Sequence, residues 1–567
     1  MTRRALTTIV IVALAAAVPP SPASARAPDA PLVRLPFPSY DGTLTPYTFE
    51  LGYPLVTLVY DTLFWRDADG TPRPWLARSL RRSNGGRRLT ITLRNGVRWH
   101  DGRPLTADDV AFTFQFVAGH FHPRFTPELG DIERVRATGP LTVTIDLRRD
   151  SLGFEDQPLA DLPILPRHLW QGLRPGQAAP PGLPVGSGPY RLVSAQPSTG
   201  YVFAANHAYF EGAPRVEQIR VPIVHDEQRA YDALRQRRVD MLPFGLPKGP
   251  AADVGTAFGI AVRTGPLYSG TTLLLNLRRP PFDRPAARRA VADALDLGRI
   301  VRNVGPAAAA EQGYIHPASP WASGASVQRF DPTAARTAVA RLQLPTIRVL
   351  AAESDPVRLE AGRQVVLALQ RAGAKATLTK LSSASLSQAI GETGSAPDFD
   401  AAIESTPPLA SDDPAFLAAL FGSDPRTAPL NSTGYRSQAF DALAQRVASA
   451  PDLQARRDAA GAELRLLASD LPAIPLFFSQ GTFVYRPAIY DGWLFVKGTG
   501  ILDKRSFLAG QTSPRAGSEG SGVAPPSVPG SGSGSGLDDV DVASLVVLAV
   551  VLALAATALL ARRSGRR

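Results

Sequence analysis

The stretch ITLRNGVRWHDGRPLTADDV, residues 91–110, passes from the pattern of a β-strand to that of an α-helix. Over residues 89–93, leucine and isoleucine alternate with threonine, which indicates a half-buried strand. An Asn-Gly pair at 95–96 and an Asp-Gly pair at 101–102 follow, and both pairs favour tight turns. We therefore expect a strand that ends in two turns.

A helix is expected directly after these turns. Thr106 precedes Asp109 by three residues, which is the spacing of a capping box at a helix N-terminus. The residues that follow place one apolar face on this helix, formed by Val110, Phe114 and Val117. Residues 141–147 return to strand alternation, so the sequence predicts a strand–helix–strand unit.

A second unit of this kind lies in the C-terminal half. TIRVLAA at 346–352 and ATLTKL at 376–381 have the character of strands, and residues 356–373 between them have that of a helix. Gly373 stands where a helix C-cap is expected. Such a unit favours a parallel pair of strands, so we expect a mixed α/β protein with more than one lobe.

Composition excludes several classes of protein. The chain has 567 residues, of which 44% are hydrophobic, and this supports several packed cores rather than a disordered chain. It has no cysteine, which excludes disulfides, thiolate nucleophiles, cysteine-bound zinc and lipid attachment through cysteine. The net charge of +11 is dispersed, because the arginine pairs are scattered and form no basic stripe. We therefore expect no nucleic-acid partner.

The N-terminus has the features of an export signal. Two arginines at 3–4 precede an apolar run over 5–18, two prolines, and a small-residue cleavage motif at 23–25. We predict a signal peptide over residues 1–25, with an uncleaved anchor as the alternative. The sequence does not distinguish the general secretory route from twin-arginine export.

The C-terminus has the features of a membrane anchor. Residues 542–561 are apolar apart from one serine and one threonine, which is long enough to span a bilayer as a helix. Four arginines follow within the tail 562–567, so the positive-inside rule places that tail in the cytoplasm and the body outside. Residues 510–536 are rich in Gly, Ser and Pro and are predicted to be a flexible linker.

Sequence motifs of enzymes and nucleotide-binding proteins are absent from the chain. It has no GxSxG, HExxH, GxxxxGK[ST] or GxGxxG motif. His120 and His122, with His100 upstream, give the only hint of a metal site, and ligands two residues apart do not share a helix face. Asp413-Pro414 fits an N-cap followed by a first-turn proline. We expect no catalytic residues, no metal site and no cofactor.

Residues 91–110 closely resemble the signature of family 5 of the extracytoplasmic solute-binding proteins of ABC importers, the peptide/nickel/oligopeptide-binding type. Further segments resemble the same family in the expected order, and together they span about residues 31–509. These segments are LVYDTLFWRDADGTPRPWLARSL (58–80), PVGSGPYRL (184–192), NHAYFEGAPRVEQIRV (206–221), LLLNLRRPPFDRPAARRAVADALD (273–296) and DLPAIPLFFSQ (470–480).

The resemblance implies an α/β, two-lobed periplasmic-binding-protein-like fold of type II (cluster C-like) with an extra small domain. Together with the C-terminal transmembrane helix, this gives the expected architecture. The implied parts are lobe I (31–55, 182–268 and 480–509), the extra domain (56–181) and lobe II (269–479). A ligand would lie in the cleft between the lobes, and the chain would cross near 186–189 and 275–276.

The resemblance also implies a ligand site, for which we expect Tyr40, Ser187, Gly188, Tyr268, Asn276, Ser411 and Asp412. Peptide-binding members hold the peptide amine with an aspartate shortly before a D-P pair, and this chain has Ala410 at that position. Either the ligand has no free amine there, which we favour, or Asp412 substitutes. The alternative for Asp412 is a solvated loop residue.

The expected function is that of a membrane-anchored, extracytoplasmic and monomeric receptor. It would capture a peptide or similar solute and deliver it to the permease subunits of an ABC importer. A ligand-sensing receptor without import is the alternative. The sequence leaves open whether the ligand is a peptide, a metal chelate or a sugar.

Overall fold

The computed structural model describes residues 30–508, except for 50–51, 123, 174–178, 244–258, 306, 310–312, 323–329, 354 and 393. The predicted signal peptide (1–25), linker (510–536), membrane segment (542–561) and tail (562–567) lie outside the described residues. None of the helices within the described ranges has the length and apolar character that crossing a bilayer requires.

A four-stranded sheet in the order β1-β10-β9-β8 contains the N-terminal strand. Its strands are β1 (Ala30–Arg34), β8 (Tyr190–Gln196), β9 (Gly200–Ala205) and β10 (Val216–Val221). The core beside it also takes in α1 (Tyr53–Val59) and aromatic residues from the end of the described chain, including Trp493 and Phe507. This core therefore draws on three distant parts of the sequence.

A second four-stranded sheet, in the order β4-β5-β7-β6, is antiparallel throughout. Its strands are β4 (Ala77–Ser83), β5 (Arg88–Leu93), β6 (Ile132–Gly139) and β7 (Thr142–Leu147), and the small pair β2 (Phe64–Arg66) and β3 (Pro72–Pro74) lies nearby in the sequence. One face of this sheet packs on α2 (Ala107–Gly119), and the two form a separate core.

The strand–helix–strand prediction for this region is confirmed. Exposed or half-buried residues alternate with buried ones along β5 and end at buried Leu93. The backbone N–H of Thr106 donates to the Asp109 carboxylate at 2.9 Å, so the helix begins with the expected capping box. The strand alternation and the capping box each depend on residues close together in the chain, which is why the sequence predicts both.

The third sheet is mixed, in the order β11-β17-β12-β16-β14-β15, with β13 beside β17. Its strands are β11 (Met241–Leu242), β12 (Ala261–Leu275), β13 (Ala307–Ala309), β14 (Ile347–Ala352), β15 (Ala376–Leu381), β16 (Ala401–Thr406) and β17 (Ala473–Tyr485). The helix α8 (Pro356–Arg371) connects β14 to β15, which are parallel with Ile347 opposite Ala376. Gly373 has φ +89°, so the second predicted unit is confirmed with its C-cap glycine.

Further helices complete the fold. The longer ones are α4 (Glu227–Arg235), α5 (Pro285–Ala294), α6 (Leu297–Val304), α7 (Pro332–Leu342), α9 (Ser383–Ile390), α12 (Gln438–Ala448) and α13 (Leu453–Asp470). Short helices are α3 (Arg167–Trp170), α10 (Leu409–Asp412), α11 (Leu417–Phe421) and single turns at 127–129, 155–159, 414–416 and 504–507. The core between sheet and helices spans residues 273–477.

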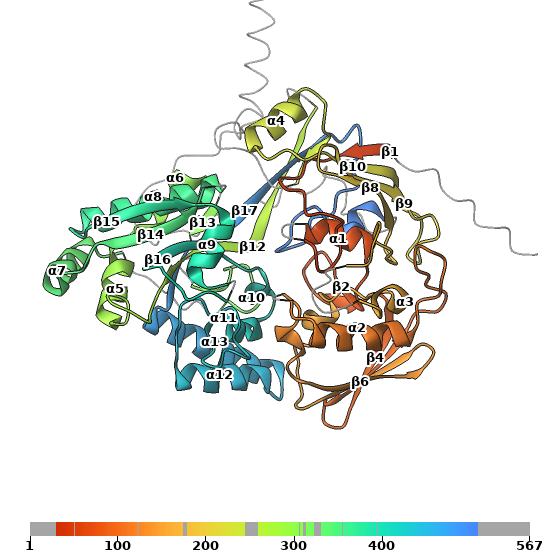
Figure 1. Cartoon of the computed structure of the whole chain (residues 1–567), viewed down its shortest axis with the longest axis horizontal. Coiled ribbons are helices and arrows are strands. Elements are labelled where there is room, and N and C mark those ends of the chain that lie inside the picture. The colour runs from red at the N-terminus through yellow and green to blue at the C-terminus, as the bar shows by residue number, and fades with distance from the viewer. Residues whose placement is uncertain are drawn as a thin grey trace, which may run out of the picture. The chain divides into compact units, whose positions relative to one another are not determined.

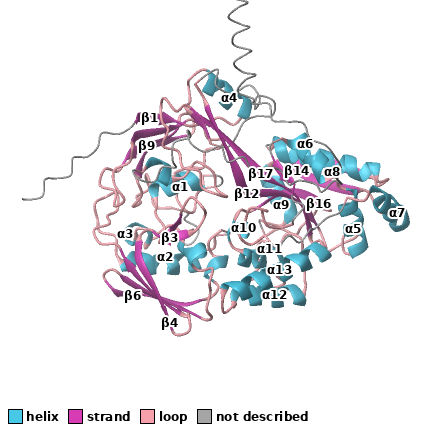
Figure 2. Ribbon diagram, turned by 180° about the vertical axis from the view of Figure 1, so that it is seen from behind, coloured by secondary structure: helices cyan, strands magenta, loops and turns pink. Residues whose placement is uncertain are grey.

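Two long strands join the cores. The strands β12 and β17 pair antiparallel over most of their length, with a register shift between Pro266 and Gly270 (Figures 1 and 2). Leu273 of β12 and Ile474 of β17 belong to the core of residues 273–477, whereas Phe483 of β17 packs into the core of the first sheet. This two-stranded ribbon is thus a direct covalent connection between two separately packed bodies.

Gly200→Ala should destabilise the first sheet. Gly200 has φ +78°, and a Cβ there would lie 1.9 Å from the carbonyl oxygen of Val221 in β10. A backbone oxygen cannot move without breaking the sheet, so we expect a loss of about 2 kcal/mol or more in the free energy of unfolding. Urea unfolding measures this loss. Gly172→Ala, where a Cβ would meet nothing within 4 Å, is the matched control, and equal stability of the two variants would contradict the expectation.

Candidate ligand-binding site

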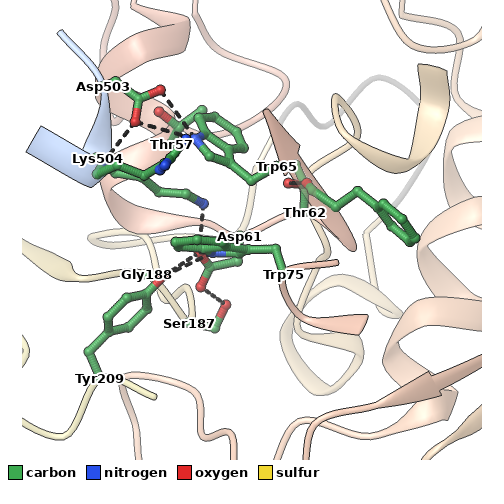
Figure 3. Close-up of polar contacts among 12 residues, drawn as sticks. Thr57, Asp61, Thr62, Trp65, Trp75, Ser187, Gly188, Tyr209, Asp503 and Lys504 are labelled. Carbon is green, nitrogen blue, oxygen red and sulfur yellow. Dashed lines mark hydrogen bonds and ion pairs between the residues drawn. The ribbon is translucent and has the colours of Figure 1, made fainter. Parts of the chain in front are cut away.

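The first of two buried polar clusters centres on Asp61. Its carboxylate accepts hydrogen bonds from Trp75 Nε1 at 2.9 Å, the Tyr209 hydroxyl at 2.8 Å and the Ser187 hydroxyl at 2.8 Å (Figure 3). It also forms an ion pair with Lys504 Nζ at 2.7 Å, and both side chains are 0% exposed. Every one of these distances is that of a normal hydrogen bond, so Asp61 is fully satisfied by the protein itself.

Aromatic rings enclose the Lys504 ammonium. It lies 4.1 Å from the ring centroid of Trp65 and 5.1 Å from that of Trp75, and Trp65 Nε1 in turn donates to the Asp503 carboxylate at 3.1 Å. Burial lowers the pKa of Lys504, and the Asp61 charge opposes this shift. The Asp61 cluster therefore has the form of a structural centre, and Ser187, expected to contact ligand, is one of its members.

The glycines beside Ser187 allow a close approach of backbone to backbone. A Cβ on Gly186 would lie 1.9 Å from the carbonyl oxygen of Val59, and one on Gly188 would lie 2.4 Å from that of Leu58. The Gly188 N–H donates to Val59 at 2.8 Å. The last turn of α1 therefore lies directly against Gly188 in the structure. A side chain at position 188 would collide with the carbonyl oxygens of that turn, so only glycine fits.

Asp61→Asn and Lys504→Met should each be strongly destabilising. Each leaves the partner charge buried without a counter-ion, which costs about 3–5 kcal/mol. The double variant should lose clearly less than the sum of the two, as measured by urea unfolding in a double-mutant cycle.

The exposed pair of Arg73 with Asp67, at 2.8 Å, is the matched control for that cycle. Its single variants, Arg73→Met and Asp67→Asn, should each change the free energy of unfolding far less than the variants of the buried pair do, because solvent screens an exposed pair. Additive losses in the Asp61–Lys504 cycle would show that the two charges do not depend on each other.

The second cluster joins residues of the first half of the chain to α10. Arg66, at the end of β2, places Nη2 3.8 Å from Asp412 Oδ2 and Nε 3.9 Å from Asp156 Oδ1. The Arg66 and Asp412 side chains are only 10% and 8% exposed. The alternative of a solvated loop residue at Asp412 is therefore wrong, because the carboxylate is buried and faces a cation.

This cluster is less completely satisfied than the Asp61 cluster. Arg66 Nη2 donates to the backbone oxygen of Asp156 at 3.0 Å, but Arg66 Nε makes no hydrogen bond to any described residue. For the Asp412 carboxylate the contact within the described chain is the 3.8 Å approach of Arg66, which is longer than a hydrogen bond. Both groups retain unused hydrogen-bonding capacity.

Tyr268 and Ser411, both expected site residues, lie around this cluster. Burial and the Asp412 charge raise the pKa of the Tyr268 hydroxyl, while Arg66 lowers it, so the three groups interact electrostatically. The Ser411 hydroxyl accepts from the backbone N–H of His316 at 2.9 Å. The His316 ring in turn lies 5.2 Å from the ring of Tyr268. Ser411 therefore contacts the loop that packs against Tyr268.

A closed ion pair lies beside Arg66. Arg124 donates to both oxygens of Asp161, at 2.9 and 2.7 Å, and its guanidinium lies 3.9 Å from the ring centroid of Tyr53. The Tyr53 hydroxyl donates to the backbone oxygen of Asp161. These contacts balance the charges of Arg124 and Asp161 against each other. Arg66, Asp156 and Asp412 remain, and we call these three residues the open part of the cluster because their polar atoms are not all hydrogen-bonded within the described chain.

Asp413 caps a helical turn, as the sequence predicts, and it also forms an ion pair. Its carboxylate accepts from the Ala415 N–H at 2.9 Å and caps the turn that begins at Pro414. It also forms a buried ion pair with Arg456 at 2.6 Å. A Cβ on Gly153 would lie 2.0 Å from Asp413 Oδ2, so the segment around Gly153 packs directly on this pair.

A hollow of about 390 Å³ is lined by segments that neighbour members of the second cluster in the chain. Its walls come from residues 127–157 on one side and 413–448 on the other, including Arg149, Phe154, Gln157, Asp413 and Gln445. Gln157 follows Asp156 in the chain, Phe154 precedes it by two residues, and Asp413 follows Asp412. A hollow of this size is within the range of small-molecule sites.

The remaining expected site residues lie elsewhere in the structure. Tyr40 stacks on Tyr201 with ring centroids 5.2 Å apart, and buried Asn276 donates to the backbone oxygen of Phe399 at 2.9 Å. Ala410, at the position of the expected amine-binding aspartate, is part of the core of residues 273–477.

The three histidines considered as metal ligands have other partners. His100 Nε2 lies 3.0 Å from the Gly188 oxygen, His120 Nδ1 lies 2.9 Å from the Phe116 oxygen, and His122 Nδ1 accepts from the Arg124 N–H at 3.1 Å. Among the described residues, no three side chains of metal-ligating type gather into a site.

Sequence reasoning missed four residues of the second cluster: Arg66, Arg124, Asp156 and Asp161. Arg66 lies inside the segment 58–80 that carries part of the family resemblance, but nothing local marks it as buried. Its partner Asp412 is distant in the sequence, and the pair forms only when the chain is folded.

Asp156→Asn should change how stability depends on pH. Burial raises the pKa of Asp156 to about 7, Asp413 and Asp412 add to the increase, and Arg66 opposes it. Because an unfolded aspartate titrates near about 4, the folded state holds an extra proton between about pH 4 and 7, and stability falls as the pH rises through that range.

The variant lacks this titration. The free energy of unfolding of Asp156→Asn minus that of wild type should therefore increase from about pH 4 to 7 and then level off. Urea unfolding across that range measures the difference, with the exposed residue Glu133 changed to Gln as control. A difference that stays constant with pH would contradict the assignment.

The chain resembles known proteins in sequence and in fold. Residues 71–428 match the sequence profile described as bacterial extracellular solute-binding proteins, family 5 (middle). Probable di/tripeptide-binding protein 5 of Pseudomonas aeruginosa is 27% identical over 315 residues, which cover 49% of this chain and 57% of that protein. Oligopeptide-binding protein AppA of Bacillus subtilis is 26% identical over 240 residues, which cover 40% and 43%. The chain thus spans about half the length of the curated relatives it matches.

Solved structures share the fold over most of the chain. The oligopeptide-binding protein AppA of Bacillus subtilis, in complex with a nonapeptide, superposes with a TM-score of 0.71 at 19% identity, covering 81% of this chain and 95% of that one. NikA of Brucella suis, in complex with Fe(III)-EDTA, gives 0.72 at 21% identity, covering 83% and 98%. The two-lobed α/β fold of periplasmic binding proteins is therefore confirmed.

Proposed function

The chain belongs to family 5 of the bacterial extracellular solute-binding proteins, and from this we propose that it is the solute receptor of an ABC importer. This family binds solutes and is not enzymatic, in agreement with the lack of catalytic motifs. The two sequence relatives named above are described as a di/tripeptide-binding and an oligopeptide-binding protein, which favours a peptide or similar amide-rich solute.

The observation that carries the proposal is the difference between the two buried clusters. The Asp61 cluster has all its partners within the chain. In the second cluster, Arg66 and Asp412 are also largely buried, but Arg66 Nε has no hydrogen-bond partner among the described residues, and Arg66 approaches the Asp412 carboxylate only to 3.8 Å. A buried polar group without a partner is unfavourable unless something else supplies the bond. A bound solute supplies it, so we place the ligand at Arg66, Asp412 and Tyr268.

The proposed division of the body follows the cores. Lobe I (31–55, 182–268 and 480–509) has the core of the first sheet, the extra domain (56–181) that of α2 and its sheet, and lobe II (269–479) that of the mixed sheet. The core of lobe I also takes in residues from the 56–181 range, namely Val56, Leu58, Val59, Tyr60, Phe116, Leu165 and Trp170. The ribbon of β12 and β17 is the proposed hinge, since its two ends belong to different cores.

The proposed cellular arrangement rests on the sequence outside the described residues. An anchor at 542–561 and the linker 510–536 would hold a monomeric body outside the membrane, within reach of the permease subunits. A tether of this kind would replace the lipid anchor that a chain without cysteine cannot carry.

Thermal melting of the full chain against a panel of solutes tests the proposal. A ligand that binds only the folded state stabilises it by about 2.7 kcal/mol at a hundredfold excess over Kd, so at least one solute should raise the melting temperature clearly. Arg66→Met or Asp412→Asn should remove that rise. Asp398→Asn, in an exposed ion pair, is the control and should keep it.

Two results would contradict the proposal. One is a panel of peptides, sugars and metal chelates in which no solute shifts the melting temperature. The other is recovery of the solute in chemically altered form, which would indicate an enzyme.

A further inference from the structure

The open part of the second cluster is balanced in charge. Arg66 faces Asp412, and the neighbouring pair of Arg124 with Asp161 is closed. Other groups that face this point are Asp156, Asp413 with Arg456, and the hydroxyls of Tyr53 and Tyr268. Burial holds Asp156 largely protonated below about pH 7, which keeps the net charge near zero.

A charged ligand group would disturb this balance. An ammonium placed beside Asp412 would compete with Arg66 and leave that guanidinium buried without a counter-ion. A carboxylate beside Arg66 would do the same to Asp412. Leaving one member of a buried pair alone is strongly unfavourable, so either charged group would be bound at a penalty.

Arg66 and Asp412 can each form further hydrogen bonds. Arg66 Nε carries an N–H without an acceptor among the described residues. Within the same part of the chain, the group that approaches the Asp412 oxygens is Arg66 at 3.8 Å, which is longer than a hydrogen bond. A ligand group with one acceptor and one donor would complete both and leave the ion pair balanced.

We infer that Arg66 and Asp412 together bind an uncharged donor–acceptor group of the solute, such as a peptide amide or a pair of sugar hydroxyls, and select against a free ammonium. This inference rests on the proposed solute-receptor function and adds the class of ligand. The hollow of about 390 Å³, which has Asp413 and Gln157 in its walls, would take the body of the solute.

Isothermal titration calorimetry of the full chain tests the inference with matched probes. Trialanine is compared in four forms, with the amine free or acetylated and the carboxyl free or amidated. Cellobiose serves as a neutral probe of another class and ferric citrate as a charged one. A neutral probe, either the doubly blocked peptide or cellobiose, should bind at least as tightly as every charged form.

Variants then identify the residues that bind. Arg66→Gln and Asp412→Asn should each weaken the neutral probe more than tenfold, because each leaves one buried charge. The double variant keeps a donor and an acceptor but no charge, so it should recover much of the affinity. Circular dichroism and thermal melting without ligand check that the variants fold. The comparison of probes on wild type does not use the variants, so it tests the inference even if a variant fails to fold.

The outcomes separate the inference from the proposed function. A free-amine form that binds more than tenfold tighter than its acetylated partner, with the preference lost in Asp412→Asn, overturns the inference and leaves the receptor function intact. If ferric citrate is the one probe that binds, the inference is likewise overturned and the receptor function stays intact. Binding of no probe, together with a flat melting panel, overturns the receptor function itself.

Discussion

The buried ion pair between Asp61 and Lys504 is the interaction on which the rest of the structure depends. It joins residues 443 positions apart, near the two ends of the described chain, and both side chains are removed from water. Taking two charges out of water costs several kcal/mol for each, so the pair persists only because tryptophan, tyrosine and serine complete its hydrogen bonds. Formation of this cluster therefore requires residues 61–75, 187, 209 and 504 to be in place together.

The Asp61 cluster also positions the proposed ligand site. β2 begins three residues after Asp61, and Arg66 is its last residue. Trp65, directly before Arg66, lies against Lys504 and donates to Asp503. The backbone that carries Arg66 is thus held from one side, while its guanidinium reaches across to Asp412. A rigid base with an incompletely satisfied tip is the arrangement expected of a binding residue, because pre-organisation reduces the entropy lost when ligand binds.

Local parts of the fold could be predicted from the sequence, and distant contacts could not. The capping box at Thr106, the strand alternation before it and the unit around α8 depend on residues close together in the chain. The cap at Asp413 was predictable for the same reason, but its ion pair with Arg456 was not. Gly188 is one of the expected site residues, and in the structure α1 carbonyl oxygens lie against it. Asp412 and Tyr268 were expected at the site, and their partner Arg66 was found only in the folded chain.

The central claim is that the polar groups left open at Arg66 and Asp412 exist to hold a solute. Native mass spectrometry of the full chain, purified gently from cells grown in rich medium, tests this most directly when wild type and Asp412→Asn are compared. The account predicts that wild type carries one small solute per chain, released on mild activation, and that the variant carries much less. An equal amount of the same solute on both proteins, or none on wild type after repeated purification, would contradict it.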